Sequence, residues 1–165
     1  MAAEHMIRVS IAEQRLLLLE GERVIMAVAV STAANGPGEL TGSQCTPRGH
    51  HMVRAKIGAG CPVNTVFVGR RPTGEIYSPV LRRAHPNRDW ILTRILWLSG
   101  LEPGRNRLGE VDTMRRYVYI HGCPDEDPMG VPSSHGCVKM HNRDLLELYE
   151  RVPVGTRVEI REEEL

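Results

Sequence analysis

The stretch YIHGCPDEDPMGVPSSHGCVKM, residues 119–140, carries the tripeptide His-Gly-Cys twice, starting at His121 and again at His135. Between the two copies the chain is rich in residues that stiffen or turn it: Pro124, Pro128, Gly130 and Pro132. Two histidines and two cysteines this close together fit three interpretations. They are a metal site, a small repeat, or two halves of one catalytic site.

The composition is that of an ordinary globular domain. The chain has 165 residues, 41% hydrophobic and 25% charged, which predicts a single domain over residues 1–165. The formal net charge is +1 and the Lys and Arg residues are spread along the chain, so we expect no nucleic-acid partner. Apolar runs fall far short of the roughly 20 residues that span a bilayer, so we expect no membrane partner either.

The N-terminal region and the cysteines predict a cytoplasmic protein. The apolar run Leu16–Leu19 is short and is flanked by Glu13 and Glu20, unlike the hydrophobic region of a secretory signal. Four cysteines in a chain of this length do not make a disulfide scaffold, and we interpret them as reduced thiols. A periplasmic or cell-wall location is the alternative if an export segment was removed upstream of Ile7.

Strand signals dominate the sequence. Ile7–Ile11, Gln14–Glu20 and Arg23–Val30 predict three strands, with a glycine turn between the last two. Further strands are predicted at residues 51–58, 64–69, 115–122 and 156–160. The strands do not alternate regularly with helices, so the sequence predicts a mainly β fold.

Two short helices and one long loop complete the prediction. Arg88–Leu98 has apolar residues at positions 91, 92, 95, 96 and 98, which is helical spacing, and Asn87 is placed to cap it. Asn142 is expected to cap a second helix over residues 143–152. Ser31–Gly49 has loop composition, and a loop of this length in a compact domain is often functional.

A metal site is one interpretation of the repeated tripeptide. A Cys2His2 zinc site would take its donors from both copies: His121, Cys123, His135 and Cys137. The usual zinc spacing is Cys-x2–4-Cys with His-x3–5-His, and this sequence does not have it. A zinc-stabilised binding module therefore stays as an alternative of another class. For Cys45 and Cys61, which have no neighbouring histidine, we expect a structural role.

A catalytic cysteine is the other interpretation. The thiolate is the nucleophile, and a nearby histidine favours it. A histidine at the end of one strand and a cysteine at the start of the next meet this need if the two strands are neighbours. Gly136, just before Cys137, lets backbone amides approach a developing oxyanion.

This pattern resembles that of the YkuD-type L,D-transpeptidases. Their mark is a His-Gly at a strand end, then a loop, then Ser/Thr-His-Gly-Cys and an apolar residue. The matching segments here are residues 121–122 and 134–138, and Thr46-Pro47-Arg48-Gly49 resembles the family's Thr-Pro-x-Gly segment. The resemblance covers nearly the whole chain. It implies a single β-barrel or sandwich-like catalytic domain with a few short helices.

The resemblance implies different roles for the two copies. His121 is the general base and Cys137 the nucleophile, whereas Cys123 has no counterpart. The carbonyl of Gly122 orients His121, and backbone amides around Gly136 and Cys137 form the oxyanion hole. His135 supports the site by hydrogen bonding. No cofactor or metal is implied.

The resemblance also implies acyl transfer on a peptidoglycan stem tetrapeptide or muropeptide, at the bond between the third-position diamino acid and D-Ala. Small members without a signal resemble cytoplasmic L,D-carboxypeptidases, so we favour water as acceptor. Transpeptidation to a 3–3 cross-link is the near alternative. Lys139 stands where the family often has Arg or Asn, so a bidentate contact is lost there. The residues expected to bind the substrate are Ser134, Lys139, Arg82, Arg83 and Arg48.

Overall fold

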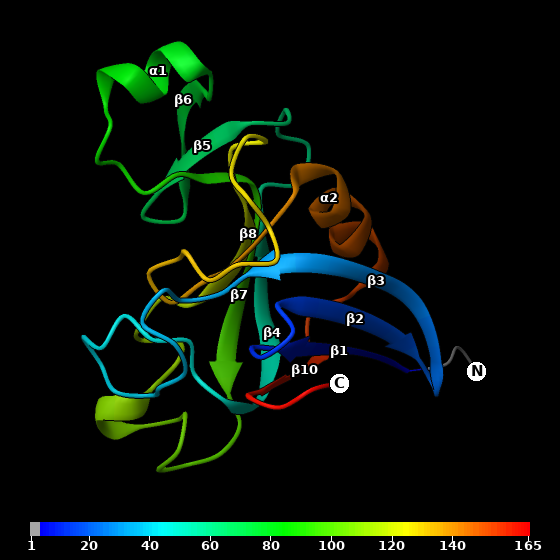
Figure 1. Cartoon of the computed structure of the whole chain (residues 1–165). Helices are drawn as coiled ribbons and strands as arrows, with labels where there is room; N and C mark the ends of the chain where they lie inside the picture. The colour runs from blue at the N-terminus through cyan, green and yellow to red at the C-terminus, as the bar shows by residue number, and fades with distance from the viewer. Residues whose placement is uncertain (1–3) are drawn as a thin grey trace.

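The computed structural model describes residues 4–165 (Figure 1). In this part of the chain it contains ten strands, two α-helices and a 3-10 helix, η1, at Gly109–Val111. The helices are α1, Pro79–Ala84, and α2, Asn142–Arg151. The strands are β1 His5–Ser10, β2 Arg15–Glu20, β3 Arg23–Ser31, β4 Gly49–Ile57, β5 Thr65–Val68, β6 Arg71–Ile76, β7 Ile91–Gly100, β8 Tyr119–Gly122, β9 Val138–Met140 and β10 Arg157–Arg161.

Eight of these strands close into a barrel. They are joined in the order β4-β10-β1-β2-β3-β9-β8-β7, and β7 returns to pair with β4. β5 and β6 form a hairpin that pairs with β7 outside this ring. In Figure 1 the hairpin and α1 lie together at the upper end of the molecule. The predicted mainly β, barrel-like fold is confirmed, and closure removes the free edges that an open sheet would expose.

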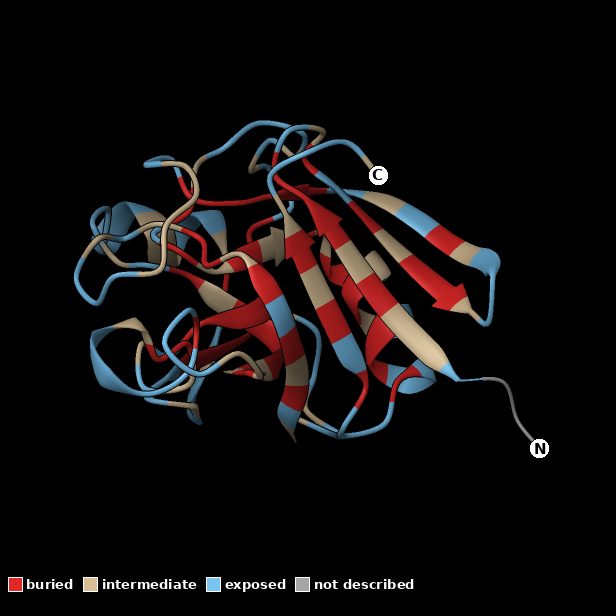
Figure 2. Ribbon diagram, turned by 90° about the horizontal axis from the view of Figure 1, so that it is seen from below, coloured by how far each residue is buried: buried red, intermediate tan, exposed pale blue. Residues whose placement is uncertain are grey.

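The N-terminal hairpin places every second side chain of its strands in the core. Ile7, Val9, Leu16 and Leu18 are fully buried, whereas Arg8 and Leu17 between them are partly exposed. Figure 2 shows this alternation as bands along the strands. Side chains on a strand point to opposite faces in turn, so the pattern puts one face of β1 and β2 into the barrel core. The predicted hairpin between β2 and β3 is confirmed.

The predicted helix at Arg88–Leu98 is wrong, since most of this segment is the strand β7. β7 pairs with β4, β5 and β8, and residues 92–96 are all buried. A strand covered on both faces loses the alternation of a half-buried strand, and its apolar run then cannot be told from a helix by spacing. A register shift between Leu92 and Ile95 also brings apolar residues to uneven positions.

The two helices begin differently from the prediction. α1, which was not predicted, starts with a proline in its first turn and is capped by Ser78, whose hydroxyl accepts from the amide of Leu81. α2 is present, but its N-cap is His141, with no side-chain capping bond. The predicted cap, Asn142, is the first helical residue, and its side chain bonds to other parts of the chain. α2 packs Leu145, Leu148 and Tyr149 into the main core.

Alternation along β8 and β9 separates the core from the site. Ile120 and Val138 lie in the main barrel core, together with residues of β1, β2 and α2. Tyr119 belongs to a second cluster, against which Cys137 packs. Because alternate side chains face opposite ways, Tyr119, His121 and Cys137 point away from the main core. Among residues 4–165, no helix has the length and apolar character needed to cross a bilayer.

Candidate active site

The nucleophile and the base of the sequence analysis come from adjacent parallel strands. β8 pairs with β9 in parallel, with Ile120 opposite Val138, so the requirement that the two strands be neighbours is met. Cys137 directly precedes β9, and its Sγ accepts a hydrogen bond from the amide of Tyr119 at 3.3 Å. His121, two residues beyond Tyr119 on β8, therefore shares its face of the sheet.

His121 and Cys137 line one cavity of about 420 Å3. Its wall also includes the hairpin between β5 and β6, the segment before β7 and the turn before β9. The further lining residues are Gly69, Arg70, Asp89, Ile91, Arg116, Tyr117, Tyr119, Ser134 and His135. This volume lies within the range of small-ligand sites. The cavity thus combines a thiol, an imidazole, cations and aromatic rings.

His121 is held by the carbonyl group that the sequence analysis named. Its ring is 1% exposed, and Nδ1 lies 2.6 Å from the oxygen of Gly122. A carbonyl oxygen only accepts hydrogen bonds, so Nδ1 carries the hydrogen and Nε2 of the neutral ring is free to accept a proton. Burial lowers the pKa of His121, while the charge of Asp89 and the bond to Gly122 partly oppose this shift. The ring is therefore neutral and oriented as a base.

The thiol of Cys137 is protonated in the free protein. Burial raises its pKa to about 12, and the Tyr119 amide and the Arg116 charge only partly counteract this effect. The raised pKa of the Cys137 thiol and the lowered pKa of the His121 imidazole favour the neutral pair over a thiolate–imidazolium pair. Proton transfer to His121 then belongs to the attack on a bound substrate.

The turn that carries Cys137 is tied together by Ser134. Its hydroxyl donates to the carbonyl of Cys137 at 2.5 Å and accepts from the amide of Gly136 at 3.2 Å. Ser134 is 5% exposed, so the structure gives this predicted substrate-binding residue a bracing role. The Gly136 amide is engaged in this bond, which leaves the Cys137 amide as the candidate oxyanion donor.

The long loop between β3 and β4 is hydrogen-bonded to the same turn through Thr46. Thr46 accepts from the amide of Ala33 at 2.9 Å and donates to the carbonyl of Gly136 at 2.9 Å. Gly136 has φ +127, a conformation that favours glycine, and a Cβ there would lie 3.3 Å from the Cys45 oxygen. Thr46, part of the Thr-Pro-x-Gly segment, thus links Ala33, just after β3, to the turn that carries Cys137.

The two His-Gly-Cys copies lie in different environments. The His135 side chain is 63% exposed at the cavity, with Nδ1 3.8 Å from a carboxylate oxygen of Asp89. This separation is longer than a hydrogen bond, so the contact with Asp89 does not supply the predicted support by hydrogen bonding. Cys123 is fully buried, and burial raises the pKa of its thiol to about 12. Within residues 4–165 no group of three or more His, Cys, Asp or Glu side chains is arranged to hold a metal ion.

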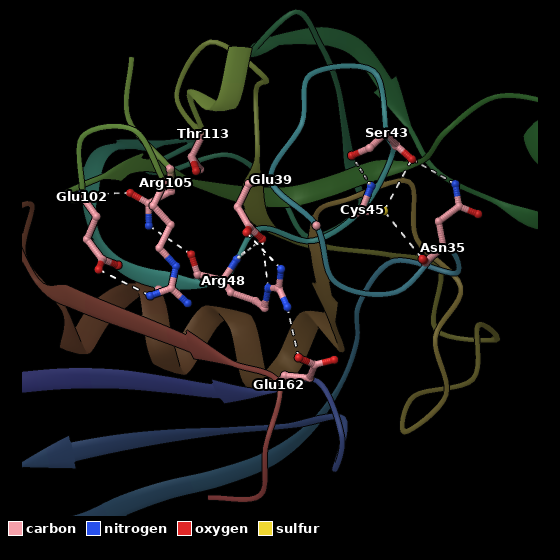
Figure 3. A network of polar contacts seen from close by, with 12 residues as sticks. Asn35, Glu39, Ser43, Cys45, Arg48, Glu102, Arg105, Thr113 and Glu162 are labelled. Atoms are coloured by element: carbon pink, nitrogen blue, oxygen red, sulfur yellow. Dashed lines mark hydrogen bonds and ion pairs between the residues drawn. The ribbon is translucent and has the colours of Figure 1, made fainter. Parts of the chain in front are cut away.

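The cations predicted to bind substrate lie outside the cavity. Lys139 Nζ is 3.4 Å from Asp127, and Arg82 donates to the other oxygen of the same carboxylate at 2.8 Å. Arg83 is exposed on α1. Arg48 contacts Glu39 through two nitrogens at 3.1 Å and also pairs with Glu162 (Figure 3). The acidic partners of Arg48, Arg82 and Lys139 are distant in sequence or lie on the loop after β8, so these ion pairs cannot be foreseen from the sequence.

Two arginines that the sequence analysis did not name line the cavity. Arg70 donates to the hydroxyl of Tyr119 at 3.1 Å, and its guanidinium lies 4.5 Å from the ring centre of Tyr117. Arg116 donates to the carbonyl of Cys45 at 2.7 Å. Both contact neutral groups rather than carboxylates in these bonds, so the bonds leave the two positive charges uncompensated. No local sequence signal distinguishes these two residues from other arginines.

A thiol and an oriented imidazole in one cavity of a closed barrel define the class, a cysteine-dependent acyl-transfer site. The family model of the YkuD L,D-transpeptidase catalytic domain matches residues 4–160, and the chain belongs to this family. The chain is 34% identical over 89 residues to YkuD of Bacillus subtilis, covering 54% of this chain and 44% of that protein. With YkuD of Bacillus licheniformis it shares 48% identity over 46 residues, 28% of each chain. It therefore matches less than half the length of these relatives.

Solved structures show the same fold. L,D-transpeptidase 3 of Mycobacterium tuberculosis, solved with a faropenem-derived adduct, aligns with a TM-score of 0.60 at 15% identity. The alignment covers 97% of this chain and 61% of that one. An L,D-transpeptidase of Mycobacterium smegmatis aligns with a TM-score of 0.57 at 19% identity, over 96% of this chain and 58% of that one. At these identities the likeness supports the fold alone.

Proposed function

We propose that the protein cleaves peptidoglycan stem tetrapeptides at the bond between the third-position diamino acid and D-Ala, with water as the favoured acceptor. This is L,D-carboxypeptidase activity. The observation that carries it is the shared cavity of Cys137 and His121, in which Gly122 holds the imidazole with Nε2 unprotonated. Membership of the YkuD family supports the substrate class.

The mechanism needs only groups of this chain, the peptide and water. The thiol proton of Cys137 passes to Nε2 of His121 as Sγ attacks the peptide carbonyl carbon. The oxyanion accepts a hydrogen bond from the Cys137 amide. His121 then gives its proton to the leaving nitrogen, D-Ala departs, and a thioester remains. Water attacks this thioester with His121 again as base, which releases the tripeptide and restores the thiol.

The cavity supports a small anionic substrate. Its volume of about 420 Å3 accommodates one short peptide segment rather than two. Arg70 and Arg116 line this space, and a tetrapeptide that ends in D-Ala carries a carboxylate at its C-terminus. These observations favour one stem plus water. We therefore propose Arg70 and Arg116 as the substrate anchors in place of Lys139 and Arg82, which pair with Asp127.

Cross-linking transpeptidation is the second candidate, because the cavity opens to solvent beside the thiol. The side chains of His135 and Asp89 are 63% and 50% exposed, so an amine of a second stem has an approach. We further propose that the protein acts in the cytoplasm. The four unpaired cysteines at Cys45, Cys61, Cys123 and Cys137 support a reducing compartment. Fractionation of cells that carry the native gene tests the location, and recovery with the cell wall contradicts it.

Competition between acceptors tests the proposed reaction. The protein is incubated with a disaccharide tetrapeptide, alone and with excess of an amine acceptor peptide, and the products are identified by mass. The proposal predicts tripeptide as the main product even with acceptor present. Predominant cross-linked dimer moves the assignment to a transpeptidase. No product from the wild type, alongside bound zinc in the purified protein, returns the binding-module alternative.

A further inference from the structure

A buried polar cluster lies directly behind the base. Asn142, the first residue of α2, is 2% exposed, and Thr93 of β7 is fully buried beside it. The hydroxyl of Thr93 donates to Oδ1 of Asn142 at 2.6 Å. Buried polar side chains carry a large cost unless they are hydrogen-bonded, so a connected pair at this position calls for a reason.

The amide of Asn142 fixes the chain at the end of β8. Its Nδ2 donates to the carbonyl of Cys123 at 3.0 Å and also lies within hydrogen-bond distance of Asp125 at 3.2 Å. The peptide that it holds directly follows the Gly122 carbonyl that receives the His121 hydrogen. A Cβ on Gly122 would collide with Asn142 and with the carbonyl of Leu92. Asn142 therefore packs directly against Gly122, the residue whose carbonyl orients His121.

Thr93 holds an unfavourable backbone conformation in order to reach Asn142. Its φ is +78, which is rare for a residue branched at Cβ. It lies in the irregular part of β7, between Leu92 and Ile95, where the register with β8 shifts. Besides bonding to Asn142, its hydroxyl accepts from the amide of Asn64 at 3.1 Å. Strain of this kind persists where the surroundings fix it, and it clusters at functional sites.

We propose that Asn142 and Thr93 are positioning residues that hold the Gly122 carbonyl in place, and through it the tautomer and orientation of His121. This inference rests on the proposed role of His121 as base. It assigns to Asn142 a task that differs from capping α2. It also explains why β7 is irregular beside the site, where a regular strand would point this side chain elsewhere.

A matched residue elsewhere in the barrel separates positioning from general support. Asn106 is also fully buried, and its Nδ2 donates to the carbonyls of Arg48 at 3.0 Å and His50 at 3.1 Å. Its Oδ1 accepts from the amide of Glu102 at 3.0 Å. Asn106 thus joins chain segments in the same way as Asn142, but it holds residues 48–50 and not the segment that follows Gly122.

The test compares Asn142→Ala, Thr93→Val and Thr93→Ser with Asn106→Ala. Thr93→Val keeps the branched shape and replaces the hydroxyl with a methyl group, whereas Thr93→Ser keeps the hydroxyl and loses the methyl group. The tautomer of the His121 ring is read by 15N NMR of the free protein. Acylation of Cys137 by imipenem is followed under single-turnover conditions by intact-protein mass. The tautomer is measured without substrate, so this reading stands even if the proposed reaction fails.

The proposal predicts a ring with hydrogen on Nδ1 in the wild type, Thr93→Ser and Asn106→Ala. It predicts mixed tautomers in Asn142→Ala and Thr93→Val, with acylation slowed on the order of 100-fold, as for a misplaced catalytic group. Asn106→Ala is expected to lower the melting temperature and keep the acylation rate. If Asn142→Ala and Thr93→Val are only less stable, with tautomer and rate unchanged, the cluster is structural and the proposal is overturned.

Discussion

The amide of Tyr119 donates a hydrogen bond to Sγ of Cys137 over 3.3 Å. Two residues further along the same strand, His121 enters the same cavity. The four-residue strand β8 thus positions both the nucleophile and the base, one through a backbone amide and the other through its own side chain. This arrangement explains why the two His-Gly-Cys copies contribute different atoms.

Removing the base should slow the chemical step much more than removing the exposed histidine. General acid–base catalysis contributes typically 10²–10⁴-fold, so His121→Ala is expected to lower the single-turnover acylation rate by that factor. His135 is exposed and lies 3.8 Å from Asp89 without a hydrogen bond between them, so its loss should cost less than about tenfold. Rapid-quench measurement of both variants checks this. A larger defect in His135→Ala would exchange the two roles.

The Cys137 thiol should react with iodoacetamide at a rate that keeps rising with pH. Because its pKa is raised to about 12, the thiolate fraction grows about tenfold per pH unit between pH 7 and pH 9. Arg116 favours the thiolate, so Arg116→Gln should raise the pKa further and slow alkylation at each pH. Arg115→Gln, at the exposed neighbour, is the control. Peptide mapping reports Cys137 alone, and a rate that levels off below pH 8 contradicts a protonated resting thiol.

Arg70 is expected to anchor the substrate. Arg70→Gln removes one of the two guanidinium groups that line the cavity and should raise KM for a tetrapeptide about tenfold or more, as for loss of a hydrogen bond between charged groups. Arg83→Gln, on the exposed face of α1, should leave KM unchanged. Steady-state kinetics of both variants and the wild type give the KM values to be compared. Equal KM values for Arg70→Gln and the wild type would remove Arg70 from substrate binding.

Stability should fall in mild acid because burial lowers the pKa of both His51 and His121, and the contribution of His51 can be isolated by mutation. Burial lowers the pKa of His51 to about 4, against about 6.5 in the unfolded chain. Below pH 6.5 the unfolded state binds the proton first, so stabilisation present above pH 6.5 is lost as the pH falls to 4, roughly 3 kcal/mol in all. His51→Gln should flatten this dependence. His50→Gln, at the exposed neighbour, should keep it. The free energy of unfolding in urea is measured against pH, and the same pH dependence in His51→Gln as in the wild type would refute the assignment.

Residues with short-range signals could be predicted from the sequence. The hairpin of β2 and β3 follows from two strand-like segments joined by a glycine turn, and α2 from the polar residue Asn142 at its start. The nucleophile and base follow from the repeated tripeptide and the family resemblance, which point to Cys137 and His121. In each case the residues that matter are close in sequence, so their relation can be read without the fold.

Features that depend on distant partners could not be predicted. β7 has no alternation because residues 92–96 are buried on both faces of the strand, and nothing within Arg88–Leu98 reveals the neighbours β4 and β8. Lys139 is predicted from the sequence to bind the substrate, and only the fold shows that Asp127 lies beside it. Asn142 stands at a helix start, where capping is the usual role, and only the fold shows Thr93 and Cys123 around its side chain.

The most direct test of the central claim is the identity of the acylated residue during turnover. A disaccharide tetrapeptide is mixed with the protein, the reaction is quenched in acid within one turnover, and the adduct is mapped by mass. The account predicts the substrate minus D-Ala as a thioester on Cys137, present in Cys123→Ser and absent in Cys137→Ser. An adduct on another residue, or tripeptide formation by Cys137→Ser at the wild-type rate, would contradict it.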